Sequence, residues 1–240
     1  MHTGKGQVLE LILESGYRHA RVSCPPNLIP SPGQYLLSGD GSNAPLPVPL
    51  FHTDSAPQGF IAAAPIPDSW HPGTELQLRG PLGHGFNLPL SARKVGLIAF
   101  DASPARLRGL IAPALKQDAA VVFVCNSSVD HLPDEVEVQP LSALNDIVEW
   151  ADYLAFDVSR ENVNLLRERL GKLNQVVTGK ARVATEGSGR NESQVLIHTP
   201  VPCGGVAECG VCAVTLNSAW KLACKDGPVF DWVEVESKVS

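Results

Sequence analysis

Four of the six cysteines lie close together near the end of the sequence, at spacing C-x5-C-x2-C-x11-C. They are Cys203, Cys209, Cys212 and Cys224. Neighbouring thiolates repel one another and are held together by a cation, and small residues between them let backbone amides turn toward the sulfurs. We therefore predict that these four cysteines are the ligands of a metal centre.

The spacing bears on which metal is bound. The plant-type [2Fe-2S] pattern is C-x4-C-x2-C with a distant fourth cysteine, and this sequence differs from it by one residue in the first gap. Structural zinc sites usually contain two close ligand pairs, whereas here only Cys209 and Cys212 form one. The pattern favours a [2Fe-2S] cluster, with zinc as the competing metal and disulfides as the remaining alternative.

The overall composition excludes several classes of partner. The 240 residues carry a net charge of −6 and only 18% charged residues, so no basic field attracts nucleic acid or anionic lipid. No apolar stretch reaches the length that spans a bilayer, and the first residues do not have the form of a signal peptide. We expect a cytoplasmic protein with reduced thiols, in which Cys24 and Cys125 are small residues in or near the core.

Residues 1–92 have the pattern of a small antiparallel β-barrel. Short apolar runs alternate with Pro and Gly clusters, and the dense prolines between Pro25 and Pro89 disfavour helix. The predicted strands are 8–13, 20–22, 34–37, 59–62 and 75–78.

Residues 93–190 have the pattern of an α/β domain, whose alternating strands and helices predict a parallel sheet. One helix is expected to begin at Ser103 with Pro104 in its first turn, and Pro113 is expected to end or bend it. The clearest helix begins at Ser159 and stops at Gly171. The predicted strands are 95–100, 119–124, 136–138 and 153–156, with a short helix over 143–150.

Residues 191–240 are expected to form a small [2Fe-2S] cluster-binding lobe. A predicted strand at 194–198 precedes the cysteines, and segments 213–216 and 229–233 are predicted to pair around the metal. Glu208, between two of the ligands, is either a charge that lowers the cluster potential slightly or an ordinary solvated residue.

Three motifs and the order of the parts resemble the electron-transfer subunit of class 1B dihydroorotate dehydrogenase, a branch of the ferredoxin reductase-like flavoproteins. The motifs are Pro32-Gly33-Gln34-Tyr35, the stretch from Gly80 to Phe86, and the Asp-Gly-Pro-Val-Phe sequence at 226–230. The resemblance implies a ferredoxin reductase-like fold, FAD on the barrel that accepts hydride from NADH, and a cluster that passes electrons to an FMN-bearing catalytic subunit. It also implies a hetero-oligomer and a loop-shaping role for His84.

The sequence departs from this family where the flavin would bind. The family's Arg-Pro-hydrophobic-Ser motif corresponds to residues 46–52, which lack both the Arg and the hydroxyl, so a pyrophosphate loses its fork-shaped cationic partner. Pro65 and Pro67 remove amides from residues 62–70, where the family has a phosphate-binding turn. We do not expect FAD to bind in the family's manner, and we assign no FAD-binding residues.

The sequence departs further from the family where the nicotinamide nucleotide would bind. The family has a Gly-rich loop after the first strand of its α/β domain, whereas this sequence has Asp101, Ser103 and Pro104 there. A carboxylate then stands where an anion would bind, and a proline stands where an amide should point. We do not expect NAD(P)H to bind, and we interpret Asp101 and Ser103 as helix caps.

The leading hypothesis is a [2Fe-2S] electron-transfer subunit that relays electrons to or from a flavoprotein partner, such as a dihydroorotate dehydrogenase-like catalytic subunit. It would be a component of an oxidoreductase complex and not a catalyst by itself, because the scattered histidines form no nucleophile arrangement and no catalytic residue is assigned. Two alternatives stay open: a complete FAD/[2Fe-2S] subunit that oxidises NAD(P)H for a dihydroorotate dehydrogenase, and a structural subunit whose cysteines hold zinc.

Overall fold

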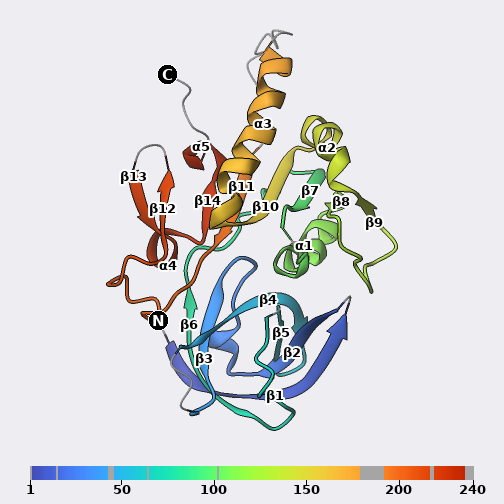
Figure 1. Ribbon diagram of the computed structural model, residues 1–240. Coiled ribbons are helices and arrows are strands. Elements are labelled where there is room, and N and C mark those ends of the chain that lie inside the picture. The colour runs from blue at the N-terminus through green and yellow to red at the C-terminus, as the bar shows by residue number, and fades with distance from the viewer. Residues whose placement is uncertain are drawn as a thin grey trace.

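The structure is a computed structural model that describes residues 2–14, 16–42, 46–63, 65–101, 103–178, 192–216 and 219–235, with the side chains of 172–178 left out. A β-barrel at one end packs against an α/β domain at the other, and the cysteine-bearing segment lies at one side of both (Figure 1). Within the described residues no helix is long and apolar enough to cross a membrane.

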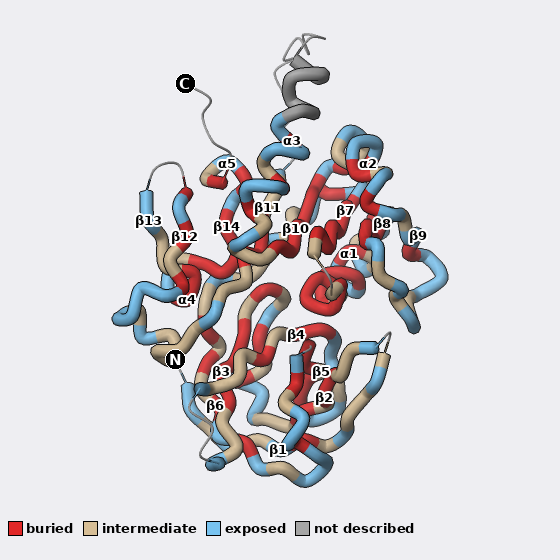
Figure 2. Tube along the Cα trace, in the orientation of Figure 1, coloured by how far each residue is buried: buried red, intermediate tan, exposed pale blue. Residues whose placement is uncertain are grey.

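The barrel is closed and antiparallel, with strand order β1-β2-β5-β4-β3-β6. Aliphatic and aromatic residues form its buried core, and along β6 they alternate with more exposed positions (Figure 2). The strands are β1 (His2–Glu14), β2 (Tyr17–Ser23), β3 (Tyr35–Gly39), β4 (Val48–Ala56), β5 (Gly59–Ala62) and β6 (Glu75–Leu82), with a 3-10 turn η1 (Pro26–Leu28).

The five predicted barrel strands are confirmed, but β4 was not among them. Pro47 and Pro49 interrupt its apolar pattern, and proline in a sequence argues against a strand. In the structure Pro49 lies opposite Leu37 in the antiparallel register of β3 and β4. The polar loop at 39–45 lies partly outside the described residues, which omit 43–45.

The second sheet has the order β14-β11-β10-β7-β8-β9, and all its neighbours are parallel except β14, which runs antiparallel to β11. The predicted parallel sheet is therefore confirmed. Two of its strands, β11 and β14, belong to residues 191–240, so the expected lobe shares this sheet. The strands are β7 (Lys94–Ala99), β8 (Ala120–Val124), β9 (Val136–Gln139), β10 (Tyr153–Ser159), β11 (Glu192–His198) and β14 (Val229–Asp231).

Helices cover both faces of this sheet. On one face lie η2 (Ala105–Leu110) and α1 (Ile111–Lys116), whose apolar residues pack on alternate side chains of β7 and β8. On the other face lie η3 (Leu141–Ala143), α2 (Leu144–Trp150), η4 (Arg160–Asn162), α3 (Val163–Thr178) and α5 (Trp232–Val235). The predicted stop at Gly171 is wrong, because α3 continues beyond it. Pro113 lies inside α1 and does not end the helix, so the bend that was the other expectation for Pro113 stays a prediction.

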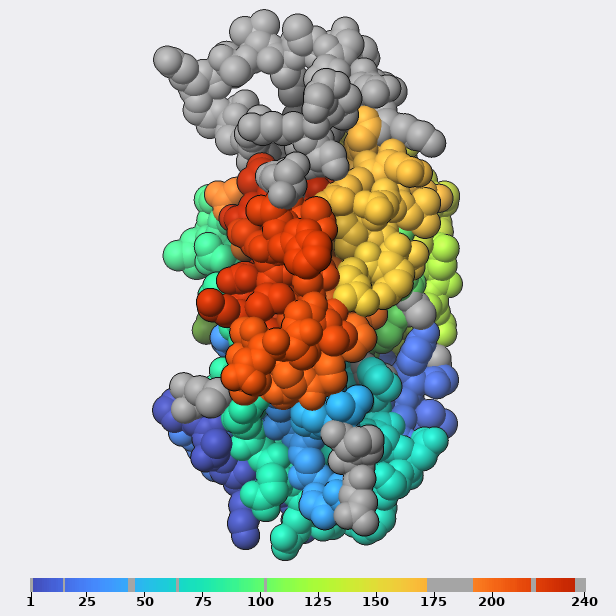
Figure 3. Space-filling model, turned by 60° about the vertical axis from the view of Figure 1, so that its left-hand side comes forward, coloured from blue at the N-terminus to red at the C-terminus, as the bar shows by residue number. Residues whose placement is uncertain are grey.

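The cysteine-bearing segment packs on the same face as α3. Cys212 and Cys224 belong to one buried cluster with residues of α3, α5 and the sheet. In Figure 3 this segment, orange, lies directly above the blue and cyan barrel and beside the yellow start of α3. The predicted pairing of 213–216 with 229–233 is wrong, because β12 (Ala213–Leu216) instead forms a hairpin with β13 (Ala219–Leu222). A short helix α4 (Ala223–Asp226) follows that hairpin.

Candidate metal centre

The cysteine loop turns tightly because several of its residues have left-handed backbone conformations. Gly204, Gly205 and Gly210 have φ of 67°, 74° and 68°, and Ala207 has φ of 63°. Glycine adopts this conformation without a steric penalty, which is why the small residues lie between the cysteines. A Cβ on Gly205 would lie 3.2 Å from Leu82 Cδ1, so the loop is also seated closely on the barrel.

The four thiols lie as two pairs. The sulfurs of Cys212 and Cys224 are 3.3 Å apart and both residues are buried, while Cys203 and Cys209, which form a side-chain hydrogen bond with each other, are half-buried and exposed respectively. All six cysteines are free thiols, so the disulfide alternative has no support. Within the described ranges, no three or more Cys, His, Asp or Glu side chains form a ready-made metal-binding group. Full ligation by all four cysteines thus stays a prediction.

Backbone amides converge on the sulfur of Cys203. Burial acts to raise the pKa of this thiol, but a hydrogen bond with Cys209 and the amides of Cys209, Glu208 and Val206 outweigh it and lower the pKa to about 6. A thiol with this pKa is largely a thiolate at neutral pH, the form that ligates metals. Amides turned toward sulfur are the environment predicted for an iron–sulfur ligand.

Cys212 and Cys224 form the inner, buried pair, and Cys203 and Cys209 form the outer pair. In the inner pair the pKa of Cys224 is raised, whereas that of Cys203 in the outer pair is lowered. Burial raises the pKa of Cys224 to about 12, together with its hydrogen bond to Cys212 and the charge of that neighbour, while the amide of Ala207 acts in the lowering direction. Two thiols this close in an apolar setting both ionise only when a cation is present. The inner pair is therefore suited to a metal and unsuited to any role as a free nucleophile.

The fourth cysteine is held in place by the end of the barrel. The His84 amide donates to the Gly227 carbonyl at 2.6 Å, and His84 Nδ1 lies 3.1 Å from the Asp226 carbonyl oxygen. A Cβ on Gly83 would lie 2.4 Å from Pro228, so only glycine fits there. The loop-shaping role expected for His84 matches these contacts, which join two of the motifs that carried the resemblance.

Two arginines fasten the cysteine-bearing segment to the helices beside it. Arg160 donates to the Val211 carbonyl, next to Cys212, and Arg167 donates to the carbonyls of Thr215 and Val235. Desolvation lowers the pKa of Arg167, which still leaves it a cation at neutral pH. The backbone partners of an arginine leave no signal in the sequence, so these two contacts are visible only in the structure.

Tyr35 lies where the barrel meets the cysteine loop. Its side chain is 1% exposed, and its hydroxyl has no hydrogen-bond partner among the described residues. Burial raises the pKa of Tyr35, and the charges of Cys224, Cys212 and Cys203 raise it further, so the phenol stays protonated. A buried donor without an acceptor beside a set of thiols fits a site that receives an anionic metal–sulfur group.

The surface to which the resemblance assigns the flavin is covered by the α/β domain's own helix η2. A Cβ on Gly109 would lie 2.7 Å from His52 Nδ1 and 3.2 Å from Pro32 Cγ. The guanidinium carbon of Arg106 lies 6.0 Å from the centre of the Phe51 ring on β4. The residues present at this part of the barrel therefore do not fit a flavin ring between the domains.

A small hollow also lies between the domains, lined by residues of β1, β2 and η2. It has about 220 Å³ of empty space including open solvent, below the ~300–1,000 Å³ of typical small-molecule sites. Glu14 and Arg108 line it and form an ion pair of 2.6 Å that joins β1 to η2.

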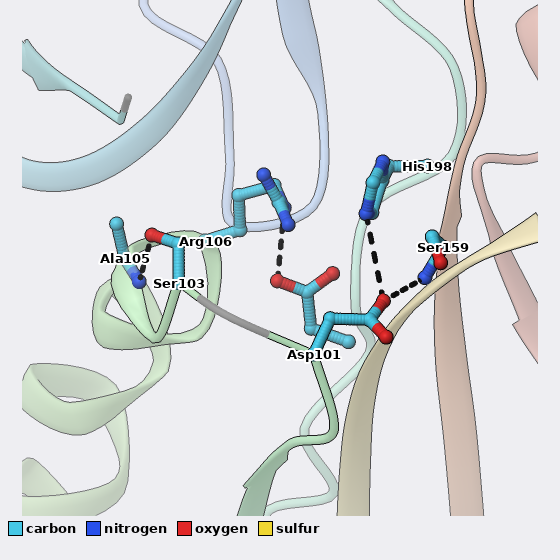
Figure 4. A network of polar contacts seen from close by, with 7 residues as sticks. Asp101, Ser103, Ala105, Arg106, Ser159 and His198 are labelled. Carbon is cyan, nitrogen blue, oxygen red and sulfur yellow. Dashed lines mark hydrogen bonds and ion pairs between the residues drawn. The ribbon is translucent and has the colours of Figure 1, made fainter. Parts of the chain in front are cut away.

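The carboxyl edge of the parallel sheet, where such folds bind nucleotides, holds an acidic network (Figure 4). The Asp101 carboxylate accepts hydrogen bonds from the Ser159 amide and the Asn162 side chain, and it lies 3.7 Å from His198 Nε2. Asp101 therefore ties the end of β7 to the start of η4, which follows the neighbouring strand β10. The interpretation of Asp101 as a cap of the helix that follows it is wrong, because its carboxylate bonds to Ser159 and Asn162 and η2 has no capping bond from its N-cap residue.

A buried ion pair completes this edge. Arg106 Nε donates to Asp157 Oδ2 at 2.8 Å, and the two residues are 7% and 2% exposed. Burial raises the pKa of Asp157, with the Arg106 charge acting against it. Ser103 Oγ accepts from the Ala105 amide at 3.4 Å, a weak cap of η2. Neither Arg106 nor Asp157 was singled out in the sequence, since each looks like an ordinary helix or strand residue until the fold brings them together.

The other residues considered in the sequence are Glu208, Cys125 and Cys24. Glu208 is exposed, in line with a solvated residue. Cys125 is buried directly after β8, and Cys24 is half-buried directly after β2. Burial raises the pKa of both thiols, that of Cys24 to about 11, so neither is reactive at neutral pH.

Comparison with known proteins bears on both parts of the molecule. Residues 203–236 match the family model described as the iron–sulfur cluster binding domain of dihydroorotate dehydrogenase B. The segment thus matches an iron–sulfur domain over all four predicted ligands, and the resemblance inferred from the motifs is confirmed there.

Solved structures similar to the chain have the same fold. One, from a study of flavin-based electron bifurcation by NADH-dependent reduced ferredoxin-NADP oxidoreductase, has a TM-score of 0.69 and 17% identity over 95% of this chain and 88% of its own. The ferredoxin reductase in carbazole 1,9a-dioxygenase has a TM-score of 0.54 and 16% identity over 71% and 64% of the two chains. The flavohem-like FAD/NAD-binding domain of nitric oxide dioxygenase from Vibrio cholerae has a TM-score of 0.53 and 15% identity, over 82% of this chain and 98% of that domain's chain. The predicted ferredoxin reductase-like fold is confirmed.

Proposed function

We propose that the chain is a [2Fe-2S] electron-transfer subunit that uses a ferredoxin reductase-like fold as a rigid support for its cluster. The observation that carries this proposal is a segment that matches an iron–sulfur domain and contains two pairs of thiols, Cys203 with Cys209 and Cys212 with Cys224, with backbone amides turned toward the sulfur of Cys203. Cys203, Cys209, Cys212 and Cys224 would hold the irons, which supply one-electron chemistry when bound. The outer and inner thiol pairs would be drawn together by the cluster, a movement that the glycine-rich loop between them allows.

The fold around the site supports relay in preference to hydride chemistry. At the barrel surface the place of a flavin is taken by η2, through Gly109 against His52. At the sheet edge two carboxylates, Asp101 and Asp157, stand where a pyrophosphate would need amides and cations. We infer that FAD does not bind in the manner of related reductases and that NAD(P)H is not the electron donor.

A partner must then supply and remove the electrons. We propose a flavoprotein catalytic subunit, of the kind implied by the dihydroorotate dehydrogenase B match, because a flavin exchanges electrons singly with a cluster. Apolar side chains are exposed on the cysteine-bearing segment: Val206 is 45%, Val211 41% and Trp220 81% exposed. Val206 and Val211 lie between the cysteines in the sequence, and Trp220 lies on β13, four residues before Cys224. We propose that the partner docks on this exposed apolar surface. Thiols that must stay reduced to bind iron fit the cytoplasm.

Anaerobic purification followed by metal, sulfide and flavin analysis tests this proposal. We expect two irons and two sulfides per chain, a visible absorption spectrum that bleaches on reduction, and no stoichiometric flavin. Colourless protein with one zinc per chain would overturn the proposal in favour of a structural subunit. Stoichiometric FAD together with NADH-dependent reduction of an artificial acceptor would instead favour a complete reductase.

The partner is tested separately by affinity purification from the native cell. A co-purifying chain that contains flavin, and whose flavin is reduced or oxidised through the cluster in rapid mixing, supports the assignment. Electron exchange that is unchanged in Trp220→Ser would show that the exposed apolar surface is not the docking site.

A further inference from the structure

Tyr35 is held rigidly at the boundary between the barrel and the cysteine loop. It begins β3, opposite Phe51 of β4 and Leu82 of β6 in the strand registers. Its ring packs on that of Phe51 with centroids 5.3 Å apart, and Leu37 belongs to the same small cluster. The side chain is 1% exposed, so the direction of its hydroxyl is fixed by packing.

The hydroxyl of Tyr35 is buried without any acceptor in the described part of the chain. Roughly 90% or more of buried polar groups in folded proteins are hydrogen-bonded, because a buried hydroxyl without a partner loses its bonds to water. A phenylalanine would fill the same space without this loss. The hydroxyl therefore requires a partner that the residues described by the structure do not provide.

The group that lies beside this hydroxyl is the cysteine loop. A Cβ on Gly205 would lie 3.6 Å from the hydroxyl oxygen, so the loop passes directly over it. The thiols of Cys203, Cys212 and Cys224 are close enough to act electrostatically on the phenol. Because residue 205 is glycine, no side chain is inserted between Tyr35 and the space that the thiols share.

We propose that the Tyr35 hydroxyl donates a hydrogen bond to a sulfur of the iron–sulfur centre and thereby raises its reduction potential. This inference rests on the proposed function. A reduced cluster carries one more negative charge than an oxidised one, so a donor to sulfur stabilises the reduced form more. Tyr35 is in this sense a positioning residue of the barrel that tunes a centre ligated by another part of the chain.

The test is a redox titration of the iron-loaded full-length protein as wild type and as Tyr35→Phe, followed by visible absorption and electron paramagnetic resonance. We expect Tyr35→Phe to keep its iron and to be harder to reduce. At the wild-type midpoint potential its ratio of reduced to oxidised cluster should be about tenfold lower, which corresponds to about 59 mV for a one-electron couple.

Tyr153→Phe is the matched control. Tyr153 is also a fully buried tyrosine, but its hydroxyl donates to Gln194 Oε1 at 2.9 Å and lies away from the cysteines. This variant should keep the wild-type midpoint. Loss of iron from Tyr35→Phe and not from Tyr153→Phe would equally support a contact between the hydroxyl and the centre.

Two outcomes would overturn the inference. One is an iron-loaded Tyr35→Phe protein with the wild-type midpoint, and the other is an equal shift in both variants. Wild-type protein that binds no iron at all would instead overturn the proposed function, so the two failures are distinct.

Discussion

Gly109 lies so close to His52 that a methyl group on Gly109 would be 2.7 Å from His52 Nδ1. This contact joins η2 of the α/β domain to β4 of the barrel, at the place where the family resemblance puts a flavin. The His52 ring is itself stacked on Phe60, with centroids 6.0 Å apart, and cannot retreat freely. The two domains are therefore fitted directly to each other at this point.

Gly109→Ala should weaken this contact between the domains. The added methyl group has to displace the His52 ring or η2, and overpacking of this kind costs typically about 1–3 kcal/mol. We expect a lower midpoint of urea unfolding, while the four cysteines should still bind iron.

Gly171→Ala is the matched control for that substitution. Gly171 lies inside α3, exposed, with no atom near the position of a new Cβ. Because alanine is the better helix former, this variant should be more stable by up to about 1 kcal/mol. Equal effects of the two substitutions would contradict the close contact at Gly109.

Replacement of the cysteines one at a time should separate ligands from core residues. Cys203→Ser, Cys209→Ser, Cys212→Ser and Cys224→Ser should each lose most of the bound iron, since serine is a poor ligand for the cluster. Cys125→Ala should retain it, because that thiol is buried in the hydrophobic cluster beneath η2 and α1, where its sulfur donates to the Ser127 carbonyl at 3.2 Å. Iron content and visible absorption after anaerobic purification are the measurements. Retention of full iron in any of the four serine variants would remove that cysteine from the ligand set.

Asp157→Asn should be strongly destabilising. It leaves the Arg106 guanidinium buried without its carboxylate, and loss of one partner of a buried pair costs about 3–5 kcal/mol. Replacement of both by apolar residues, Arg106→Met with Asp157→Leu, should recover much of that loss. Glu10→Gln serves as the surface control, because the Arg21–Glu10 pair is largely exposed and such pairs contribute at most about 1 kcal/mol. Chemical denaturation of the four proteins tests the expected order.

Stability should fall on mild acidification because two histidines are buried in the neutral form. Burial lowers the pKa of His19, and the charge of Arg108 lowers it further, while Glu14 acts to raise it. Burial also lowers the pKa of His52, while Asp54 acts to raise it. The unfolded chain therefore takes up protons near pH 6.5 while the folded chain does not, so the free energy of unfolding decreases as pH falls below that value.

His52→Gln isolates the contribution of one of these groups. It should reduce the pH slope of the unfolding free energy below pH 6.5 by up to about 1.4 kcal/mol per pH unit, the value for one proton. The comparison of slopes cancels acid effects on the cluster that both proteins share. Parallel slopes for wild type and His52→Gln would show that His52 titrates normally in the folded protein.

The sequence by itself determined the parts of the fold that depend on local pattern. Apolar runs bounded by Pro and Gly identified five of the barrel strands, and uninterrupted apolar runs identified the buried parallel strands, because side-chain periodicity is a local property. The cysteine spacing and the residues at 226–230 identified the iron–sulfur segment, because ligand chemistry requires fixed residue types at short range. Strand β4 was missed because pairing within a sheet can accommodate a proline. The continuation of α3 past Gly171 was missed because one glycine inside a helix costs only about 1 kcal/mol and does not have to end it.

Only the tertiary structure decided what surrounds that segment. Tyr35 is separated from the cysteines by more than half the chain, and its buried hydroxyl became informative only when the barrel was seen to lie under the cysteine loop. Arg106 and Asp157 likewise meet through the sheet topology, and Asp101 accepts a hydrogen bond from Ser159 at the end of the neighbouring strand. Long-range contacts of this kind depend on how the elements pack, and one sequence carries no direct signal of which distant residues will share an interior.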